Sequence, residues 1–545
     1  MNSEEAGSRR QEAGTDNHQT AFEGDHSSVL NVSFLPCLLP PASSLLTPPV
    51  RHDPTVDPNA FRWPTERPRQ TPPSGAPVTP PQPLPWKRVV KFALIWGSVA
   101  LGLAVYLAPA PAGLSVAGKT SWAIFILCTG LWISNAVPFG ITGLLAVALL
   151  ALTGAMRTSE AFAAFGNSAV FFLIGVFIIA AALIESGLSK RCALLFLRPF
   201  ERSPYAFATG MMLAAAFGTL WMPNQATSAL LFPIALEVAI ALRLAVGQSA
   251  YAKVMFLSLA WGAMIGSNAS FLGSTRAALA IGMLQEKHGI GISFSQWVVA
   301  ALPMVVLGCA VAPLVLRLCF PREEVAFTAA RQVLEDAVKE MGPIGRRQWT
   351  VAAIVSLTIA AWIILGNRVD LAVIALLGSV ALFATRCIGW EEAERRIYWN
   401  IVLMYGGAIA LGIVIDRTGA AKWLVDAVLQ GATIPPAVAV AAVAMGTLVL
   451  SEFMSNVAAV AVMLPLAFNM AGQLGASPVA LTLATSIGAG LDFALPFSSA
   501  PNTIVFSSGY LRMVDVVKAG GAMTIVSVLL VGLLVWVWWP LLGLV

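Results

Sequence analysis

Two polar, asparagine-centred segments lie in the middle of apolar sequence, and they are the residues of this chain that could do chemistry. They are residues 221–226 (WMPNQA) and 451–458 (SEFMSNVA), which align at a constant offset of 232 residues. The aligned identities are Met222/Met454, Asn224/Asn456, Ala226/Ala458, Ala229/Ala461, Pro233/Pro465 and Ala235/Ala467. Polar backbone in apolar surroundings needs water, an ion or a substrate as its partner. We therefore interpret the two segments as an internal repeat that forms two halves of one binding site.

Two further polar breaks, at residues 273–276 (GSTR) and 498–502 (SSAPN), are expected at a similar depth. Half-helix N-termini favour anions, whereas free carbonyls and hydroxyl or amide oxygens favour a desolvated alkali cation. A hydroxyl, Thr219 or Ser451, stands five residues before each central asparagine. Oxygen ligands of this kind suit a hard cation. The pattern predicts a site for an anion together with coupling cations.

Two charged residues, Arg276 and Asp492, fall within apolar segments, where a charge is costly and calls for a functional account. One hypothesis is that Arg276 permanently supplies the positive charge of a coupling cation. Another is that Arg276 binds the anion directly while Asp492 pairs with it or carries a proton. A snorkelling residue at a helix end is the structural alternative for Arg276. Glu452 is interpreted as a structural acid bonded to backbone.

The composition is that of an integral membrane protein. The 545 residues are 57% hydrophobic and 11% charged, whereas a soluble domain has about 25% charged residues. The formal charge of +5 is modest and dispersed, so we expect no nucleic-acid partner. The six cysteines lack metal-site or disulfide spacing. A hydrolase would need a nucleophile with a base, or paired acids, at membrane depth, and the sequence offers neither. We therefore expect no enzyme and no organic cofactor.

The chain divides into a polar tail and two similar halves. Residues 1–86 are Pro-rich and charged and are expected to be a disordered cytoplasmic tail, with an over-extended gene start as the alternative. Residues 87–320 form the first half, 321–348 a charged cytoplasmic loop, and 349–545 the second half. Helical hairpins that re-enter the membrane are expected at about 204–245 and 436–472. The expected spans cover about 90–109, 119–137, 138–155, 165–187, 250–288 (broken), 296–320, 349–366, 369–385, 398–415, a segment broken around 492–502, and 519–541.

With the first span set aside, each half holds about five spans, and an odd number inverts the second copy relative to the first. Lysine and arginine concentrate on one side of this arrangement, as the positive-inside rule requires if the N-terminus is cytoplasmic. The fold class predicted is an all-α polytopic membrane protein of about eleven spans in two inverted repeats, each with a re-entrant hairpin and a broken helix. We expect it in a bacterial inner membrane.

From about Lys119 onward the chain resembles the divalent anion/sodium symporter family of dicarboxylate, citrate and sulfate transporters. The segment LSEFMSN is similar to the family's T-E-F-T-S-N-T hairpin tip, and LPFSSAPNTIVFSSG to its L-P-x-A-T-P-P-N-A-I-V-F-x-S-G block. The segments WISNAVPFGITGLL, AFGNSAVFFLIGVFIIA and LMYGGAIALG also resemble family sequences. The resemblance implies a homodimer in which a transport domain containing the hairpins moves as an elevator.

The resemblance also implies the residues of three sites. The first sodium site would comprise Thr219, Pro223, Asn224 and Gly273, and the second Ser451, Ser455, Asn456 and Ser498. The substrate contacts would be Asn224, Gln225, Ser274, Asn456, Ser499 and Pro501, to which we add Arg276 and Asn502 from the same polar breaks. Asp492 is the candidate coupling residue. Na⁺ is the expected coupling ion.

The chain departs from the family pattern at both hairpin tips. Pro223-Asn224-Gln225 and Ser455-Asn456-Val457 replace the two S-N-T triplets, so both substrate-facing threonine hydroxyls are gone. The function predicted is secondary active, cation-coupled transport of a small di- or polyvalent anion, with dicarboxylate first and sulfate next. The alternative is a sodium-independent anion exchanger, or a proton-coupled carrier in which Arg276 replaces a coupling cation. Arsenite, citrate and sodium/proton carriers are the rivals within the wider superfamily.

Overall fold

The computed structural model describes residues 85–366, 368–429 and 434–545, which fold into helices without strands. The predicted tail therefore lies outside the described residues, apart from its last two positions. A single helix, α1 (Pro85–Leu107), precedes the first repeat. The first half then contains α2 (Val116–Ser134), α3 (Phe139–Leu152), α4 (Thr158–Ala163), η1 (Ala164–Gly166), α5 (Ser168–Glu185), α6 (Leu188–Leu197), η2 (Arg198–Phe200), α7 (Pro204–Gly218), α8 (Asn224–Ala241), α9 (Ala250–Gly266), α10 (Thr275–His288) and α11 (Phe294–Cys319).

A linking helix, α12 (Thr328–Glu340), leads into the second half. That half contains α13 (Arg346–Leu365), α14 (Leu371–Ala384), α15 (Trp390–Arg396), α16 (Trp399–Arg417), α17 (Ala420–Leu429), α18 (Pro436–Ser451), α19 (Asn456–Leu474), α20 (Pro478–Gly488), α21 (Ala500–Phe506) and α22 (Met513–Leu533), followed by η3 (Leu534–Trp538) and α23 (Trp539–Leu541). The helix order of the first half therefore recurs in the second. In both halves two long helices are followed by a short one, a third long helix, a connector, a hairpin, a broken helix and a closing helix.

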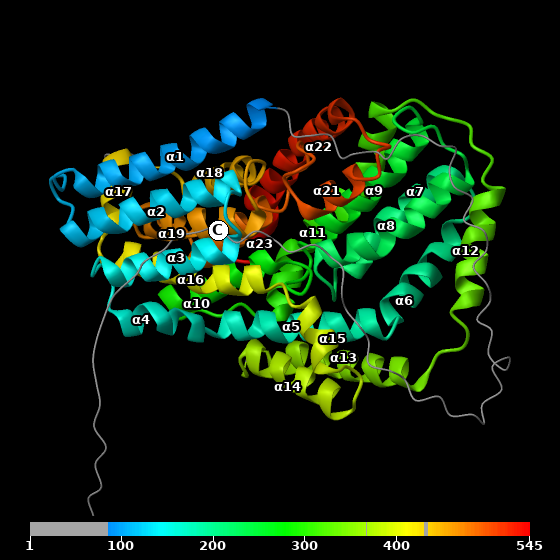
Figure 1. The fold of residues 1–545 in the computed structure, drawn as a ribbon, viewed down its shortest axis with the longest axis horizontal. Helices are drawn as coiled ribbons and strands as arrows, with labels where there is room; N and C mark the ends of the chain where they lie inside the picture. Colours follow the sequence, from blue (N-terminus) through cyan, green and yellow to red (C-terminus); the bar gives the residue numbers. More distant parts are fainter. Residues whose placement is uncertain (1–84, 367, 430–433) are drawn as a thin grey trace, which may run out of the picture. The chain divides into compact units, whose positions relative to one another are not determined.

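The contacts between the halves are reciprocal. Helix α3 packs on α16, and the equivalent helices α14 and α5 pack on each other in the same way (Figure 1). The broken helices exchange partners too, since α9 packs on α21 and α10 packs on α20. Such exchanged pairs are what a two-fold relation between two copies produces. The repeat inferred from the hairpin tips thus extends to the packing of the whole chain.

Small residues set the closest of these crossings. A Cβ at Gly407 of α16 would lie 2.4 Å from the Gly143 Cα of α3. At the equivalent crossing, a Cβ at Gly175 of α5 would lie 2.8 Å from the Ala375 Cβ of α14. Gly143 and Ala375, like Gly175 and Gly407, are 232 residues apart. Close backbone approach through small residues is how helices associate in lipid, where burial of apolar surface gives no drive.

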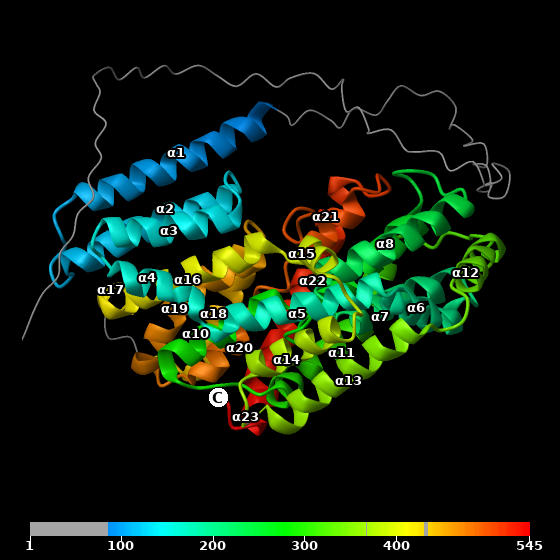
Figure 2. The ribbon, with the colours of Figure 1, turned by 60° about the horizontal axis from the view of Figure 1, so that its bottom comes forward.

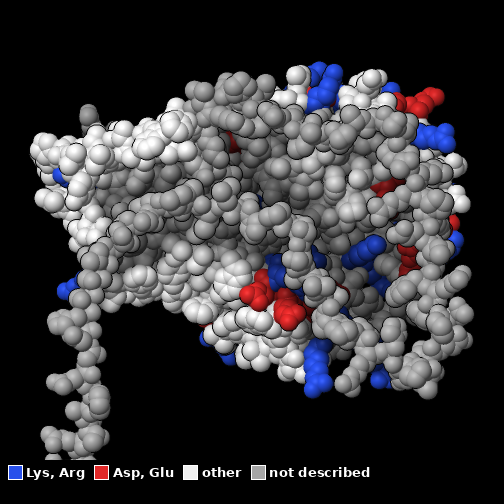
Figure 3. Space-filling view, in the orientation of Figure 1, with Lys and Arg blue, Asp and Glu red and all other residues white. Residues whose placement is uncertain are grey.

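The helices have membrane character. Among the described residues, eight helices are long and apolar enough to cross a membrane by length and composition, and six shorter apolar helices accompany them. The shorter ones include α9, α18 and α20, which are hairpin arms or halves of broken helices. On the face drawn in Figure 3, charged side chains gather near α15, while the surface over α1 to α4 shows few. The predicted all-helical polytopic membrane fold, with two repeats that each hold a hairpin and a broken helix, is confirmed.

One segment differs from the expectation. The region 321–348 was predicted as a charged loop, but thirteen of its residues form α12. Apolar residues that recur every three or four positions give this helix one apolar side, and its Ala330 and Leu334 are buried. It packs on α6 and α8 of the first half (Figure 2). An amphipathic helix of this kind can lie against the protein without spanning the bilayer.

Candidate functional site

The tip of the first hairpin joins the break of the first broken helix. Helix α7 ends at Gly218, and α8 begins at Asn224 directly after Pro223. The Asn224 backbone N–H donates to the Gly273 carbonyl at 3.2 Å. Thr219 is fully buried, and its hydroxyl donates to the Ala216 carbonyl at 2.7 Å. The structure thus brings together the residues predicted for the first cation site, while Gln225 is half-buried beside them.

The tip of the second hairpin joins the second break through side chains. Helix α18 ends at Ser451, and α19 begins at Asn456 after Ser455, whose hydroxyl accepts from the Ala458 N–H at 3.3 Å. The Asn456 amide donates to Oδ1 of Asp492 at 3.0 Å. Ser451 is fully buried, and its hydroxyl donates to the Leu448 carbonyl. Asn456 therefore ties the hairpin tip to the loop between α20 and α21.

That loop is folded around the Asp492 carbonyl. The Ser498 hydroxyl donates to this oxygen at 2.7 Å, and the Asn502 amide donates to it at 3.3 Å. Ser499 precedes α21, and Pro501 lies in its first turn. The Ser499 hydroxyl lies 3.4 Å from Met264 Sδ of α9 in the other half. The residues predicted for the second cation site therefore form one cluster with the substrate contacts predicted in the second half, which are Asn456, Ser499, Pro501 and Asn502.

Ser274 mirrors Ser499 in the first half. It precedes α10, has the same φ of −128°, and accepts the Ala277 N–H at 3.2 Å with its side chain. Both broken helices thus restart behind a serine, and free N–H groups at such a start attract negative charge. The two starts come from different halves. Helix α10 packs on α20, the first part of the other broken helix, and α21 packs on α9.

Arg276, in the first turn of α10, is fixed between the halves. Its side chain is 3% exposed, which rules out the snorkelling alternative. Nε donates to the Ser486 carbonyl of α20 at 2.8 Å, and Nη2 donates to Asn268 Oδ1 at 2.7 Å and to the Ser267 hydroxyl at 3.2 Å. A Cβ at Gly490 would lie 1.9 Å from Nη2. Nε and Nη2 therefore fix the guanidinium to Ser486 of one half and to Asn268 and Ser267 of the other.

Asp492 does not pair with Arg276, which corrects one branch of the hypothesis above. The guanidinium bonds to Ser486, Asn268 and Ser267 instead, and the described residues contain no ion pair between the two charges. Asp492 is fully buried, and its Oδ2 has no hydrogen-bond partner. The Asn502 Oδ1 is likewise buried without a partner. A carboxylate and an amide oxygen in this state are the ligands a hard cation would use.

Sequence reasoning missed the partners of Arg276. Ser267 and Asn268 lie within the span 250–288 that was predicted to be broken, but nothing in their spacing linked them to the arginine. Asn268 also donates to the Met264 and Ile265 carbonyls, and its own carbonyl accepts from Trp297 at 3.0 Å. A polar pair at a break, eight and nine residues before a buried charge, was the available signal.

Glu452 has the structural role expected of it. It is 7% exposed, and its two oxygens accept the Ala494 and Leu495 backbone N–H groups at 2.9 and 3.0 Å. These contacts hold the hairpin tip to the loop of the second broken helix.

We predict that Glu452→Gln lowers the thermal stability of the protein and leaves the substrate KM unchanged. An amide keeps one acceptor oxygen, so one backbone N–H loses its partner, at a cost of about 1–3 kcal/mol. Thermal unfolding in detergent and uptake in proteoliposomes measure the two effects. Glu394→Gln, at an exposed position of α15, is the control. A changed KM with unchanged stability would show that Glu452 contacts the substrate.

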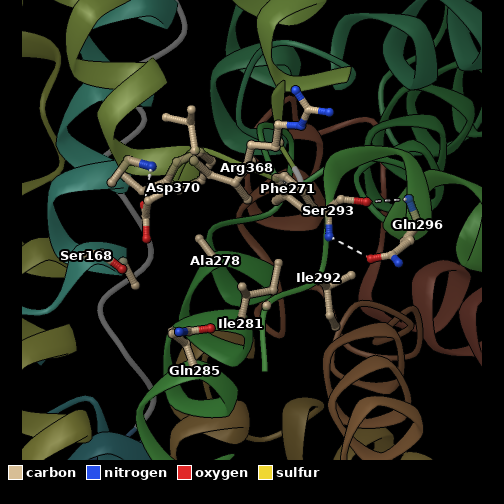
Figure 4. Close-up of a pocket in the computed structure, with 18 of the residues that line it drawn as sticks. Ser168, Phe271, Ala278, Ile281, Gln285, Ile292, Ser293, Gln296, Arg368 and Asp370 are labelled. Atoms are coloured by element: carbon tan, nitrogen blue, oxygen red, sulfur yellow. Dashed lines mark hydrogen bonds between the residues drawn. The ribbon is translucent and has the colours of Figure 1, made fainter. Parts of the chain in front are cut away.

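The described cavities do not join the two hairpin tips. The linings of five cavities among the described residues include one predicted site residue, Pro223. The cavity in Figure 4, of about 580 Å³, is bounded instead by α5, α10, α11 and the turn before α14. Ser168, Gln285 and Asp370 face it from three of these elements (Figure 4). Asn224 bonds to the segment before α10 and Asn456 to the segment after α20, and α10 packs on α20.

The arrangement defines a membrane transport protein, and comparison with known proteins gives its family. The family model "Sodium:sulfate symporter transmembrane region" matches residues 89–545, so the chain belongs to this family, whose members are transporters rather than enzymes.

The chain is also similar to individual proteins. A Haemophilus influenzae protein named as an uncharacterized transporter is 27% identical over 75% of this chain and 89% of its own. The sodium-dependent dicarboxylate transporter SdcS of Staphylococcus saprophyticus is 25% identical over 78% of this chain and 87% of its own. The solved YdaH transporter of Alcanivorax borkumensis is 14% identical, with a TM-score of 0.47 over 84% of this chain and 98% of its own.

Proposed function

We propose that the protein is a secondary active transporter of a small divalent or polyvalent anion, with a dicarboxylate as the first expected substrate and sulfate as the second. The observation that carries this proposal is the buried Arg276, which lies in the first turn of α10 and donates to the Ser486 carbonyl of the other half. A fixed guanidinium and free N–H groups recognise carboxylate or sulfate oxygens. The SdcS relatives, named as dicarboxylate transporters, support the order of the two substrates.

The coupling ion we propose is Na⁺, bound in the second half. Asp492 Oδ2 and Asn502 Oδ1 are buried oxygens without partners next to Asn456 and Ser498. In the first half Arg276 lies beside the predicted first cation site. Its positive charge favours a single coupling cation over two, because a second cation would repel it. The alternative is that Arg276 replaces the cation altogether, which gives a sodium-independent exchanger or a proton-coupled carrier.

We further propose an elevator movement of the hairpins and broken helices against the remaining helices. In this proposal the hairpins 204–245 and 436–472 re-enter the membrane and the halves 87–320 and 349–545 are inverted. The N-terminus faces the cytoplasm of a bacterial inner membrane. Support comes from the concentration of Lys and Arg in the segments that this topology places inside, and from the reciprocal packing of the two halves. A homodimer is the expected assembly.

Ligand-induced stabilisation tests the substrate and the ion together. Purified protein is heated with succinate, malate, citrate, sulfate or phosphate, in sodium or in choline. We expect a dicarboxylate to raise the melting temperature in sodium and to have less effect in choline. A ligand at 100 times its Kd adds about 2.7 kcal/mol of stability. Equal shifts in both salts would favour the sodium-independent alternative, and no shift with any anion would contradict the proposed function.

A further inference from the structure

Two grooves of the molecule are copies of each other under the repeat. The first lies between α5 and α8 and has a volume of about 360 Å³. The second lies between α16 and α19 and has a volume of about 140 Å³. Their walls share the positions Phe177/Ile409, Ala180/Gly412, Ala181/Ile413, Ile184/Asp416 and Pro233/Pro465, all 232 residues apart. The same surface of the repeat is therefore open in one half and nearly closed in the other.

Equivalent residues of the two grooves differ in their exposure. Ala229 and Pro233 line the first groove and are exposed, whereas their counterparts Ala461 and Pro465 are buried. Helix α19 packs directly on α16, while the equivalent helices α8 and α5 face each other across the first groove. The difference between the grooves is thus a difference in how near each hairpin lies to its neighbouring helix.

Polar contacts lie along the second groove at the C-terminal end of α10. Lys287 of α10 forms an ion pair with Asp416 of α16 at 2.6 Å, and both residues line the groove. The neighbouring Glu286 accepts a hydrogen bond from the side chain of Asn167 at 3.0 Å, just before α5. In the first groove Ile184 stands where the second has Asp416, and Arg396 of the lining pairs instead with Glu185, the next residue of α5, at 2.8 Å.

The first groove leads to the candidate site. Pro223, directly before Asn224, lies at one end of it, and the charged side chains of Lys190, Glu237 and Arg396 lie elsewhere along its lining. All three are exposed. Charged side chains keep a groove hydrated, and a hydrated path is what an anion needs inside a membrane protein.

We propose that the groove between α5 and α8 is the cytoplasmic entrance for the anion, and that the Lys287–Asp416 pair is the latch that closes the equivalent outer entrance between α16 and α19. This inference rests on the proposed transport function. The structure represents the inward-open state, and transport breaks the latch, opens the second groove and closes the first. Because the two grooves are copies, the outward-open state exchanges their shapes.

Cysteine accessibility tests the two grooves with a matched pair. The six native cysteines are replaced by alanine, and Ala229→Cys or Ala461→Cys is added. A membrane-impermeant maleimide is applied to right-side-out or inverted vesicles. We expect the cysteine at 229 to react from the cytoplasmic face about tenfold faster than the one at 461, because thiol reactivity follows exposure. The pair Glu237→Cys and Asn469→Cys, also repeat equivalents, replaces the first pair if either alanine variant fails to fold.

The latch is tested in the same background with Asp416→Asn. We expect it to make the cysteine at 461 reactive from the outer face and to slow the reaction at 229. Equal rates at 229 and 461 from one face overturn the assignment of the grooves. An unreactive cysteine at 461 in the Asp416→Asn background overturns the latch. Failure of the proposed function is distinguishable, because the unmodified protein would then take up no anion while the difference in accessibility persisted.

Discussion

Replacing Arg276 with alanine is expected to reduce anion uptake by about 100-fold or more. A buried charge-assisted contact to an anion contributes about 3 kcal/mol, which corresponds to that factor. The alanine also leaves the Ser486 carbonyl and the Asn268 side chain without their donor. Uptake of labelled succinate by proteoliposomes, with and without a sodium gradient, measures the effect.

Arg276→Lys separates the two hypotheses for this residue. Lysine keeps the charge but cannot reproduce the planar fork that reaches Ser486 and Asn268 at once. If Arg276 stands in for a coupling cation, the lysine variant retains uptake and the alanine variant becomes more dependent on sodium. If Arg276 binds the anion through its fork, both variants lose affinity. Unchanged affinity and unchanged sodium dependence in the alanine variant would discard both hypotheses.

Replacing Gly273 with alanine is expected to destabilise the protein and to reduce anion uptake. A Cβ at this position would lie 2.0 Å from the Thr219 carbonyl oxygen. The hairpin tip and the helix break must then separate, which breaks the bond from the Asn224 N–H to the Gly273 carbonyl. Such overpacking costs about 1–3 kcal/mol, and we expect uptake to fall about tenfold or more. Thermal unfolding and uptake measured on one preparation report the two losses.

Gly472→Ala is the control for that substitution. Gly472 lies in α19, and a Cβ there would meet no atom within 4 Å. Alanine is the better helix former by about 1 kcal/mol, so this variant is expected to be as stable as the unmodified protein or more stable. A Gly273→Ala variant that unfolds and transports like the Gly472→Ala variant would show that the tip and the break need no close contact.

Much of the fold was accessible to sequence reasoning because lipid restricts what a chain can do. Backbone groups in the bilayer core must be bonded within the protein, so breaks in apolar sequence become visible as functional features. Such breaks predicted the hairpins and the broken helices, and they led to the alignment of Asn224 with Asn456. The helix in the linker was not, because a short amphipathic segment beside a membrane protein carries the composition of an ordinary charged loop.

The sequence by itself determined the class of the protein, the repeat, and the identity of the residues at the four polar breaks, since composition and periodicity are local properties. Only the tertiary structure decided the partners of Arg276, because Ser486 lies 210 residues away and nothing in the local pattern of either residue refers to the other. It also decided that Asp492 bonds to Asn456 rather than to Arg276. The difference between the two grooves could not be predicted from the sequence for a further reason. Equivalent segments with similar residues can lie near to or far from their neighbours, and the conformation of the whole chain decides which.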